Sequence, residues 1–361
     1  MLLAPALFPA LFLGLQCTPS FTRRLPRVRM SANDFDGAVS KLPTAAQLCS
    51  AADEEVADLT DLVWTAIRGQ AAAASSSPVL APFFQTTISS ESTLPNALAA
   101  VLARKIASDS LTPCEPLADE LACIFGEPAV CKLITSDLLA VVEADPAAPE
   151  LLTVLLHFKG FLALQAHRAA HQLWARENDA AARQLALLLQ GRASELFGVD
   201  IHPGASIGGA TFIDHASGIV IGEQAAMRPK PRAPRVRVAH SSPREPALRC
   251  PSPVSERGCN PHRCDQASMG YGCYMLHGVT LGATGKRDKK TGRRHPAVGD
   301  RVTLGSGSAC LGPITVGDGA TVGATAVVTK DVAAGATVID TSYLNNKVLM
   351  PRKPKVQPIE A

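Results

Sequence analysis

A small apolar residue recurs every six positions in the last part of this 361-residue chain. The period holds without a miss at Val298, Leu304, Cys310, Val316, Val322 and Val328. A helix repeats every 3.6 residues and a strand every two, so neither element alone produces a period of six. A coil of short parallel strands does, because each side of the coil takes six residues and turns one apolar side chain inward.

The same period begins earlier in the chain and is interrupted once. It marks three further pairs of residues six apart: Ile207 and Ile213, Ile221 and Met227, Met275 and Leu281. Residues 228–269 interrupt it. We therefore predict a left-handed parallel β-helix of hexapeptide repeats over residues 199–340, with an insertion at 228–269 and a C-terminal tail at 341–361.

Residues 40–198 show the three-to-four-residue apolar spacing of helices instead. Val56, Leu59 and Val63 follow it, and prolines divide the region into several helices. The low-complexity run 71–77 is predicted to be a loop. The fold class is therefore α+β, with an N-terminal α-helical domain followed by the β-helix.

The first 34 residues have the composition of a targeting segment. Met1–Leu15 is apolar and too short to span a bilayer, and the first acidic residue is Asp34. The basic stretch between them predicts import into a plastid or another organelle. The alternatives are a secretory signal, or a cytoplasmic protein that starts at Met30.

Residues 228–269 differ from the rest of the chain. They hold eight prolines and nine basic residues against three acidic ones, a composition typical of disordered segments. A solvated loop, a partner-binding arm and an untranslated segment kept in the gene model are all compatible with it. The cluster Cys250, Cys259, His262 and Cys264 lacks a zinc-site spacing, so no metal is predicted. Outside this segment and the basic N-terminus the chain is mildly acidic, which argues against a nucleic-acid partner.

Three motifs carry the chemistry of the predicted coil. They are Asp200-Ile201-His202-Pro203, Asp214-His215-Ala216-Ser217-Gly218 and Arg294-His295-Pro296. In this order, and with a helical stretch from Phe158 to Arg168 before them, the chain resembles the serine O-acetyltransferase family over roughly residues 60–350. The resemblance implies acetyl transfer from acetyl-CoA to L-serine, the first step of cysteine biosynthesis. It also implies homotrimers or dimers of trimers, and cysteine synthase as a candidate partner, with no nucleic acid and no membrane.

A serine hydroxyl needs a base near neutral pH, and a histidine oriented by a carboxylate supplies one. The resemblance assigns these roles to His215 and Asp200. For binding the serine ammonium and carboxylate it assigns Asp145, Asp214, Arg294 and His295. For acetyl-CoA it assigns Gly282, Ala283, Thr284, Ser306 and Ala324.

The chain departs from the family pattern in several places. Ala283 stands where the family has a second glycine, Arg293 replaces an acid, and the chain ends in Ala361, whereas members that dock into cysteine synthase commonly end in isoleucine. Another hexapeptide acyltransferase with a different acceptor, or an inactive scaffold for cysteine synthase, are the alternative functions. The presence of Asp200, His215, Arg294 and His295 argues against the scaffold.

Overall fold

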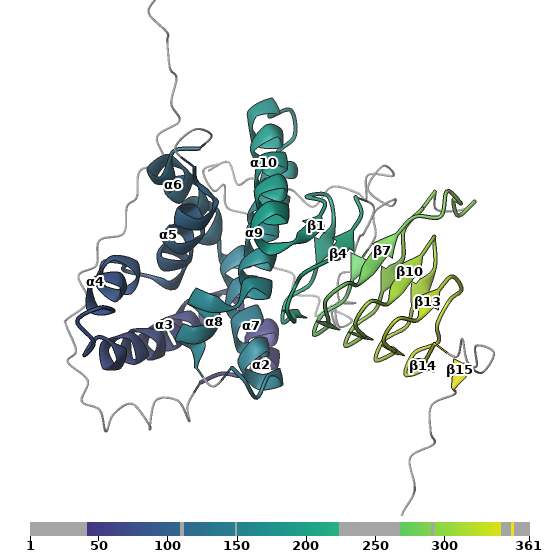
Figure 1. Ribbon diagram of the computed structural model, residues 1–361, viewed down its shortest axis with the longest axis horizontal. Helices are drawn as coiled ribbons and strands as arrows, with labels where there is room; N and C mark the ends of the chain where they lie inside the picture. Colours follow the sequence, from purple (N-terminus) through teal and green to yellow (C-terminus); the bar gives the residue numbers. More distant parts are fainter. Residues whose placement is uncertain are drawn as a thin grey trace, which may run out of the picture.

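The computed structural model describes residues 42–108, 112–148, 150–223, 268–289 and 292–340, and the backbone of 348–349. The predicted targeting segment, all but the last two residues of the predicted insertion, and most of the C-terminal tail lie outside these ranges. Helices fill the first part of the described chain and short strands the second (Figure 1). This is the predicted order of the α+β fold.

The helical part ends where a glycine takes a left-handed conformation. Its elements are α2 (Ala45–Ser50), α3 (Asp53–Ala74), α4 (Ala81–Phe84), η1 (Gln85–Ser89), α5 (Leu94–Ile106), α6 (Cys114–Phe125), α7 (Pro128–Ala144), α8 (Leu151–His157), α9 (Lys159–Trp174) and α10 (Ala180–Phe197). The predicted loop at 71–77 was wrong at its start: α3 continues to Ala74, because alanine is the best helix former. Gly198, with φ of +71°, ends α10 and leads into the first strand.

The strands stack into three parallel sheets that form a three-sided coil. The first sheet has the order β1 (Val199–Ile201), β4 (Ile219–Ile221), β7 (Thr280–Gly282), β10 (Ala309–Leu311), β13 (Val327–Val328). The second sheet is β2 (Ser206–Ile207), β5 (Ser268–Met269), β8 (Ala297–Val298), β11 (Thr315–Val316). The third sheet is β3 (Phe212–Ile213), β6 (Tyr274–Met275), β9 (Thr303–Leu304), β12 (Thr321–Val322), β14 (Thr337–Val338), with β15 (Val348–Leu349) added antiparallel.

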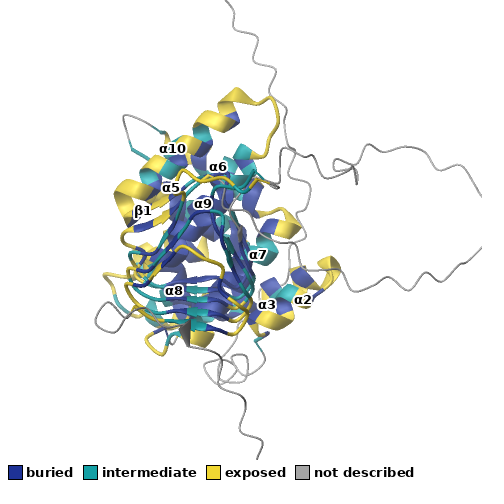
Figure 2. Cartoon of the chain, turned by 90° about the vertical axis from the view of Figure 1, so that its right-hand side faces the viewer, coloured by how far each residue is buried: buried dark blue, intermediate teal, exposed yellow. Residues whose placement is uncertain are grey.

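The six-residue period is the inner column of this coil. All six residues of the unbroken run, from Val298 to Val328, are at most 5% exposed. In Figure 2 the buried residues are dark blue along the strands of the coil. Each turn of the coil visits the three sheets once, so a residue six positions on lies on the next side with the same inward direction.

The coil resumes one repeat earlier than predicted. Met269, assigned to the insertion, lies in β5 between Ile207 and Val298 and is 1% exposed. The proline-rich composition before it hid this repeat, although Met269 is six residues before Met275. Met227, the residue that the sequence placed at this step of the period, lies outside the described residues.

A buried ion pair joins the helical part to the first turn of the coil. Arg168 on α9 donates two hydrogen bonds to the carboxylate of Asp137 on α7, at 2.7 and 3.0 Å. The same guanidinium donates to the carbonyl oxygens of Ile207 and Gly208, at 2.9 and 2.7 Å, while the backbone N–H of Thr211 donates to Asp137. Burial raises the pKa of the Asp137 carboxyl, and Arg168 opposes that shift. This network sets where the helices meet the coil.

Candidate functional site

One corner of the coil carries the predicted base. It lies between the third and first sheets, and we call the residues 214–218, 276–279, 305–308 and 323–326 the His215 corner. Successive turns are joined there by backbone hydrogen bonds, such as Gly278 N–H to Ser217 O at 2.9 Å and Gly307 N–H to His277 O at 2.9 Å. Glycines with positive φ let the chain turn sharply at the equivalent position of three successive turns of the coil. They are Gly218, Gly278 and Gly307.

His215 stands on this corner with its side chain 74% exposed. Its Nε2 lies 3.5 Å from Oδ1 of Asp214, and its ring meets the ring of His277 edge-on at 6.0 Å between centroids. The backbone of His215 has φ of +58°, a left-handed conformation that is uncommon for a residue with a side chain. An exposed imidazole next to a carboxylate is the arrangement that a general base requires.

Tyr274 contacts Asp214 beside the predicted base. The Tyr274 hydroxyl donates to Oδ2 of Asp214 at 3.3 Å. The pKa of Tyr274 is raised by burial first, then by the charge of Asp214 and its hydrogen bond, and also by the charge of Asp145. Asp145 ends α7, and its carboxylate accepts a hydrogen bond from the Ala147 N–H at 2.8 Å. Of the predicted serine-binding carboxylates, Asp214 therefore lies beside the predicted base, and Asp145 lies at the end of α7.

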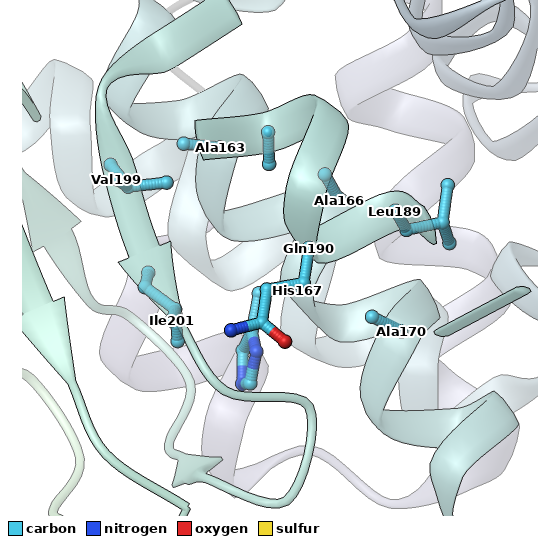
Figure 3. Close-up of a pocket in the computed structure, with 9 residues that line it drawn as sticks. Ala163, Ala166, His167, Ala170, Leu189, Gln190, Val199 and Ile201 are labelled. Atoms are coloured by element: carbon cyan, nitrogen blue, oxygen red, sulfur yellow. The ribbon is translucent and has the colours of Figure 1, made fainter. Parts of the chain in front are cut away.

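Asp200 makes a different contact from the predicted one. It points outward from the middle of β1, where its carboxylate accepts a hydrogen bond from Gln190 Nε2 on α10 at 2.7 Å. Gln190 and His167 both line a small cavity between α9, α10 and β1 (Figure 3). Within the described part of the chain, no hydrogen bond or ion pair joins Asp200 to His215.

Arg294 and His295 lie on another corner. The segment 283–296 connects β7 of the first sheet to β8 of the second, and we call it, with 202–205 and 222–223, the Arg294 corner. His295 is 9% exposed and packs against Gly222, where an added Cβ would lie 2.3 Å from its Nε2. Burial, and then the charge of Arg294, lower the pKa of His295.

The predicted acetyl-CoA residues are divided in the same way. Gly282 ends β7, and Ala283 and Thr284 follow it at the Arg294 corner, whereas Ser306 and Ala324 lie on the His215 corner. The first sheet separates the two corners within one chain. The predicted acetyl-CoA residues therefore fall into two groups, one on the His215 corner and one at the Arg294 corner.

Sequence reasoning missed His277, although a positional signal points to it. His215, His277, Ser306 and Ala324 each stand two residues after an inward residue of the third sheet. They form one column on the His215 corner, and Nε2 of His277 shares a hydrogen bond of 2.7 Å with Ser306 Oγ. Taking the second residue after each inward residue of the third sheet would have identified His277 from the sequence.

Arg293, a departure from the family pattern, makes several hydrogen bonds. Its Nη2 donates to the carbonyl oxygens of Pro313 and Ile314 and to the Thr315 hydroxyl, at 3.1 to 3.2 Å. Arg293 therefore ties the loop before Arg294 to the next turn of the coil.

Within the described part of the chain, no helix is both long and apolar enough to cross a membrane.

Two kinds of sequence comparison agree on the relatives of this chain. The family model described as "Serine acetyltransferase, N-terminal" matches residues 63–166. The Oryza sativa subsp. japonica protein named "Probable serine acetyltransferase 3" is 39% identical over 258 residues, 71% of this chain and 69% of the relative. "Serine acetyltransferase 1, chloroplastic" of Arabidopsis thaliana is 37% identical over 263 residues, 73% of this chain and 68% of the relative.

Solved structures show the same similarity. Soybean serine acetyltransferase complexed with serine superposes with a TM-score of 0.62 at 35% identity, covering 80% of this chain and 97% of that one. The serine acetyltransferase of Brucella abortus strain S19 in complex with coenzyme A gives 0.64 at 28% identity, covering 82% and 98%. These relatives match this chain over most of its length, in sequence and in overall structure, and this chain belongs to the serine acetyltransferase family.

Proposed function

We propose that this chain is a serine O-acetyltransferase, which transfers the acetyl group of acetyl-CoA to the hydroxyl of L-serine and releases O-acetyl-L-serine and CoA, the first step of cysteine biosynthesis. The observation that carries the proposal is the exposed imidazole of His215, 3.5 Å from the carboxylate of Asp214. It stands on a coil corner of a chain whose family relatives have been solved in complex with serine and with coenzyme A.

In the proposed reaction, His215 takes the proton of the serine hydroxyl while that oxygen attacks the thioester carbonyl. The carbon–sulfur bond then breaks, and the CoA thiolate takes the proton back from the imidazolium. Asp214 lies close enough to stabilise the imidazolium. Asp200, on the outer face of β1, is proposed as a second carboxylate that orients the His215 imidazole.

Asp145 and Asp214 suit the serine ammonium, while Arg294 and His295 suit its carboxylate. Acetyl-CoA is proposed to contact Gly282, Ala283, Thr284, Ser306 and Ala324. Apart from Asp145 at the end of α7, each of these sets is divided between the His215 corner and the Arg294 corner. A complete site then needs the His215 corner of one copy and the Arg294 corner of another.

We therefore propose a homotrimer of left-handed coils, paired into a dimer of trimers through the helical part. The outer face of the first sheet supports a contact between copies, because it exposes the apolar side chains of Val220 (39%) and Val327 (61%). Cysteine synthase remains a candidate partner on the family resemblance alone, and its co-elution with this chain is the measurement that checks it.

The acceptor is tested by measuring CoA release with L-serine and with other hydroxyl and amino acceptors, with the product identified by mass. We expect O-acetylserine as the main product. Arg294→Ala is expected to raise KM for serine far more than KM for acetyl-CoA, because a guanidinium pairs with a carboxylate through two hydrogen bonds. A better acceptor than serine would favour another acyltransferase. A rise in KM for acetyl-CoA instead of serine would show that the Arg294 loop serves the coenzyme.

The shared site is tested by mixing two inactive variants. If His215 and Arg294 act from neighbouring chains, mixed trimers of His215→Ala and Arg294→Ala contain some sites with both residues intact. Random mixing then restores about a quarter of the wild-type rate in a closed ring of identical interfaces, measured at low serine. The control mixture of His215→Ala with His215→Asn restores nothing. Absence of recovery from the first mixture would place both residues in the same chain's site.

Two proposals concern residues outside the described ranges. Residues 1–34 are proposed to direct the chain to a plastid or another organelle, with a cytoplasmic location as the alternative. Import of a reporter carrying this segment into isolated organelles checks it. The segment from 228 to the start of β5 is proposed to be either an insertion or a gene-model artefact, which sequencing the transcript across it decides.

A further inference from the structure

The turn that carries His215 has an unusual backbone. His215 and the buried Ala216 both have φ of +58°, in the left-handed region that residues with side chains rarely adopt. Backbone strain of this kind persists only where the surroundings hold it, and it gathers at functional sites. What holds this turn in place therefore bears on the direction of the His215 imidazole.

The first turn of α9 contacts the chain on both sides of His215. Before it, Gly160 packs so closely on β3 that an added Cβ would lie 1.9 Å from the carbonyl oxygen of Ile213. After it, the ammonium group of Lys159 donates a hydrogen bond of 2.6 Å to the Ser217 hydroxyl. The backbone N–H of Ser217 in turn donates to the carbonyl of His215 at 2.6 Å.

Helix stability does not explain a lysine at this position. Lys159 is the first residue of α9, and the first turn of the helix contains no acidic residue. A positive charge there opposes the helix dipole, which favours negative charge at an N-terminus. Lys159 therefore weakens its own helix and instead contacts the turn that carries His215. This combination fits a role in the site.

We propose that Lys159 is a positioning residue for the reaction: through Ser217, and together with the close contact at Gly160, it fixes the turn that aims His215. The inference rests on the proposed function, in which His215 is the base. It gives the helical region a part in catalysis, since α9 belongs to that region and His215 to the coil.

The test compares Lys159→Ala, Ser217→Ala and the double variant in serine acetylation. Each single variant is expected to lower kcat about tenfold, less than the 100-fold that a misplacement of 1 Å costs, with KM for acetyl-CoA unchanged. The double variant is expected to lose no more than either single one, because both changes break the same hydrogen bond. Ser217→Thr, which keeps the hydroxyl, is expected to recover most of the loss.

Two measurements separate positioning from folding. The thermal midpoint is expected to stay near the wild-type value, because an exposed hydrogen bond contributes little stability. The matched control is Lys105→Ala, which removes an exposed lysine of α5, distant in sequence from Lys159. This variant is expected to keep the wild-type kcat. Loss of kcat in step with a lower midpoint would assign Lys159 a structural role and overturn the proposal.

Other outcomes would also overturn it. Wild-type kcat in Lys159→Ala would show that the contact does not aim His215. A raised KM for acetyl-CoA in that variant, not reproduced by Ser217→Ala, would make Lys159 a ligand of the coenzyme. A wild-type chain that does not acetylate serine would overturn the proposed function itself, and the inference with it. The inference fails alone if serine is acetylated, His215 is required and Lys159 is not.

Discussion

Replacing His215 by alanine is expected to lower kcat for serine acetylation at least about 100-fold while the chain stays folded. General-base catalysis accounts for the loss, because the serine hydroxyl then keeps its proton as it approaches the thioester. Folding is expected to survive, since the side chain is 74% exposed and leaves no cavity. The measurements are steady-state kinetics together with the thermal midpoint and mass of each variant.

The backbone of His215 requires a second variant. Its φ of +58° suits asparagine better than alanine, so His215→Ala strains the turn, while His215→Asn tolerates it. Equal loss of kcat in both variants assigns the effect to the imidazole. Activity retained in the asparagine variant would assign it to the backbone and remove His215 from the mechanism.

Replacing Asp137 by alanine is expected to destabilise the protein by about 3–5 kcal/mol, the usual cost of leaving one member of a buried ion pair alone. Asp137 is fully buried and Arg168 is 4% exposed, so water cannot replace the lost partner. The carboxylate also accepts hydrogen bonds from Gln165 and from the Thr211 backbone, which lose their acceptor. Urea unfolding, followed by circular dichroism, measures the change.

A surface ion pair provides the matched control. Glu120 and Arg176 lie 2.7 Å apart with side chains 35% and 40% exposed, and Glu120→Ala is expected to cost less than about 1 kcal/mol. Asp137→Asn, which keeps the shape and loses the charge, is expected to fall between the two. If Asp137→Ala unfolded at the same urea concentration as the control, the buried pair would not hold the helices to the coil.

The fold class could be predicted because its signal is local. A period of six over consecutive residues predicts a coil of short parallel strands, and the three sheets and the burial of the whole run from Val298 to Val328 confirm the parallel strands and their inward residues. The prediction failed where composition hid the pattern, at Met269, and where low complexity looked like a loop, at Ala71–Ala74. Met269 is placed by the strands beside it, and Ala71–Ala74 is helical because of the helix propensity of alanine. Neither conformation follows from the overall composition of its segment.

The candidate site was predicted only as a set of residues. Motif identity pointed to Asp200, Asp214, His215, Arg294 and His295, but not to their arrangement. In the structure Asp214, not Asp200, lies beside the His215 ring, and Gln190 holds Asp200. Such contacts depend on which helix packs on which strand, and no spacing along the chain encodes that.

The sequence by itself determined the coil, its inner column and the residue types at its corners, because these depend on residues six positions apart or adjacent in the chain. Only the tertiary structure decided how the helical region meets the coil, through Asp137 and Arg168, and how Lys159 reaches the turn of His215. It also divided the predicted residues between two corners, since successive sides of a coil face different directions. Burial, strain and partner choice arise between segments distant in sequence, and the folded chain alone brings those segments together.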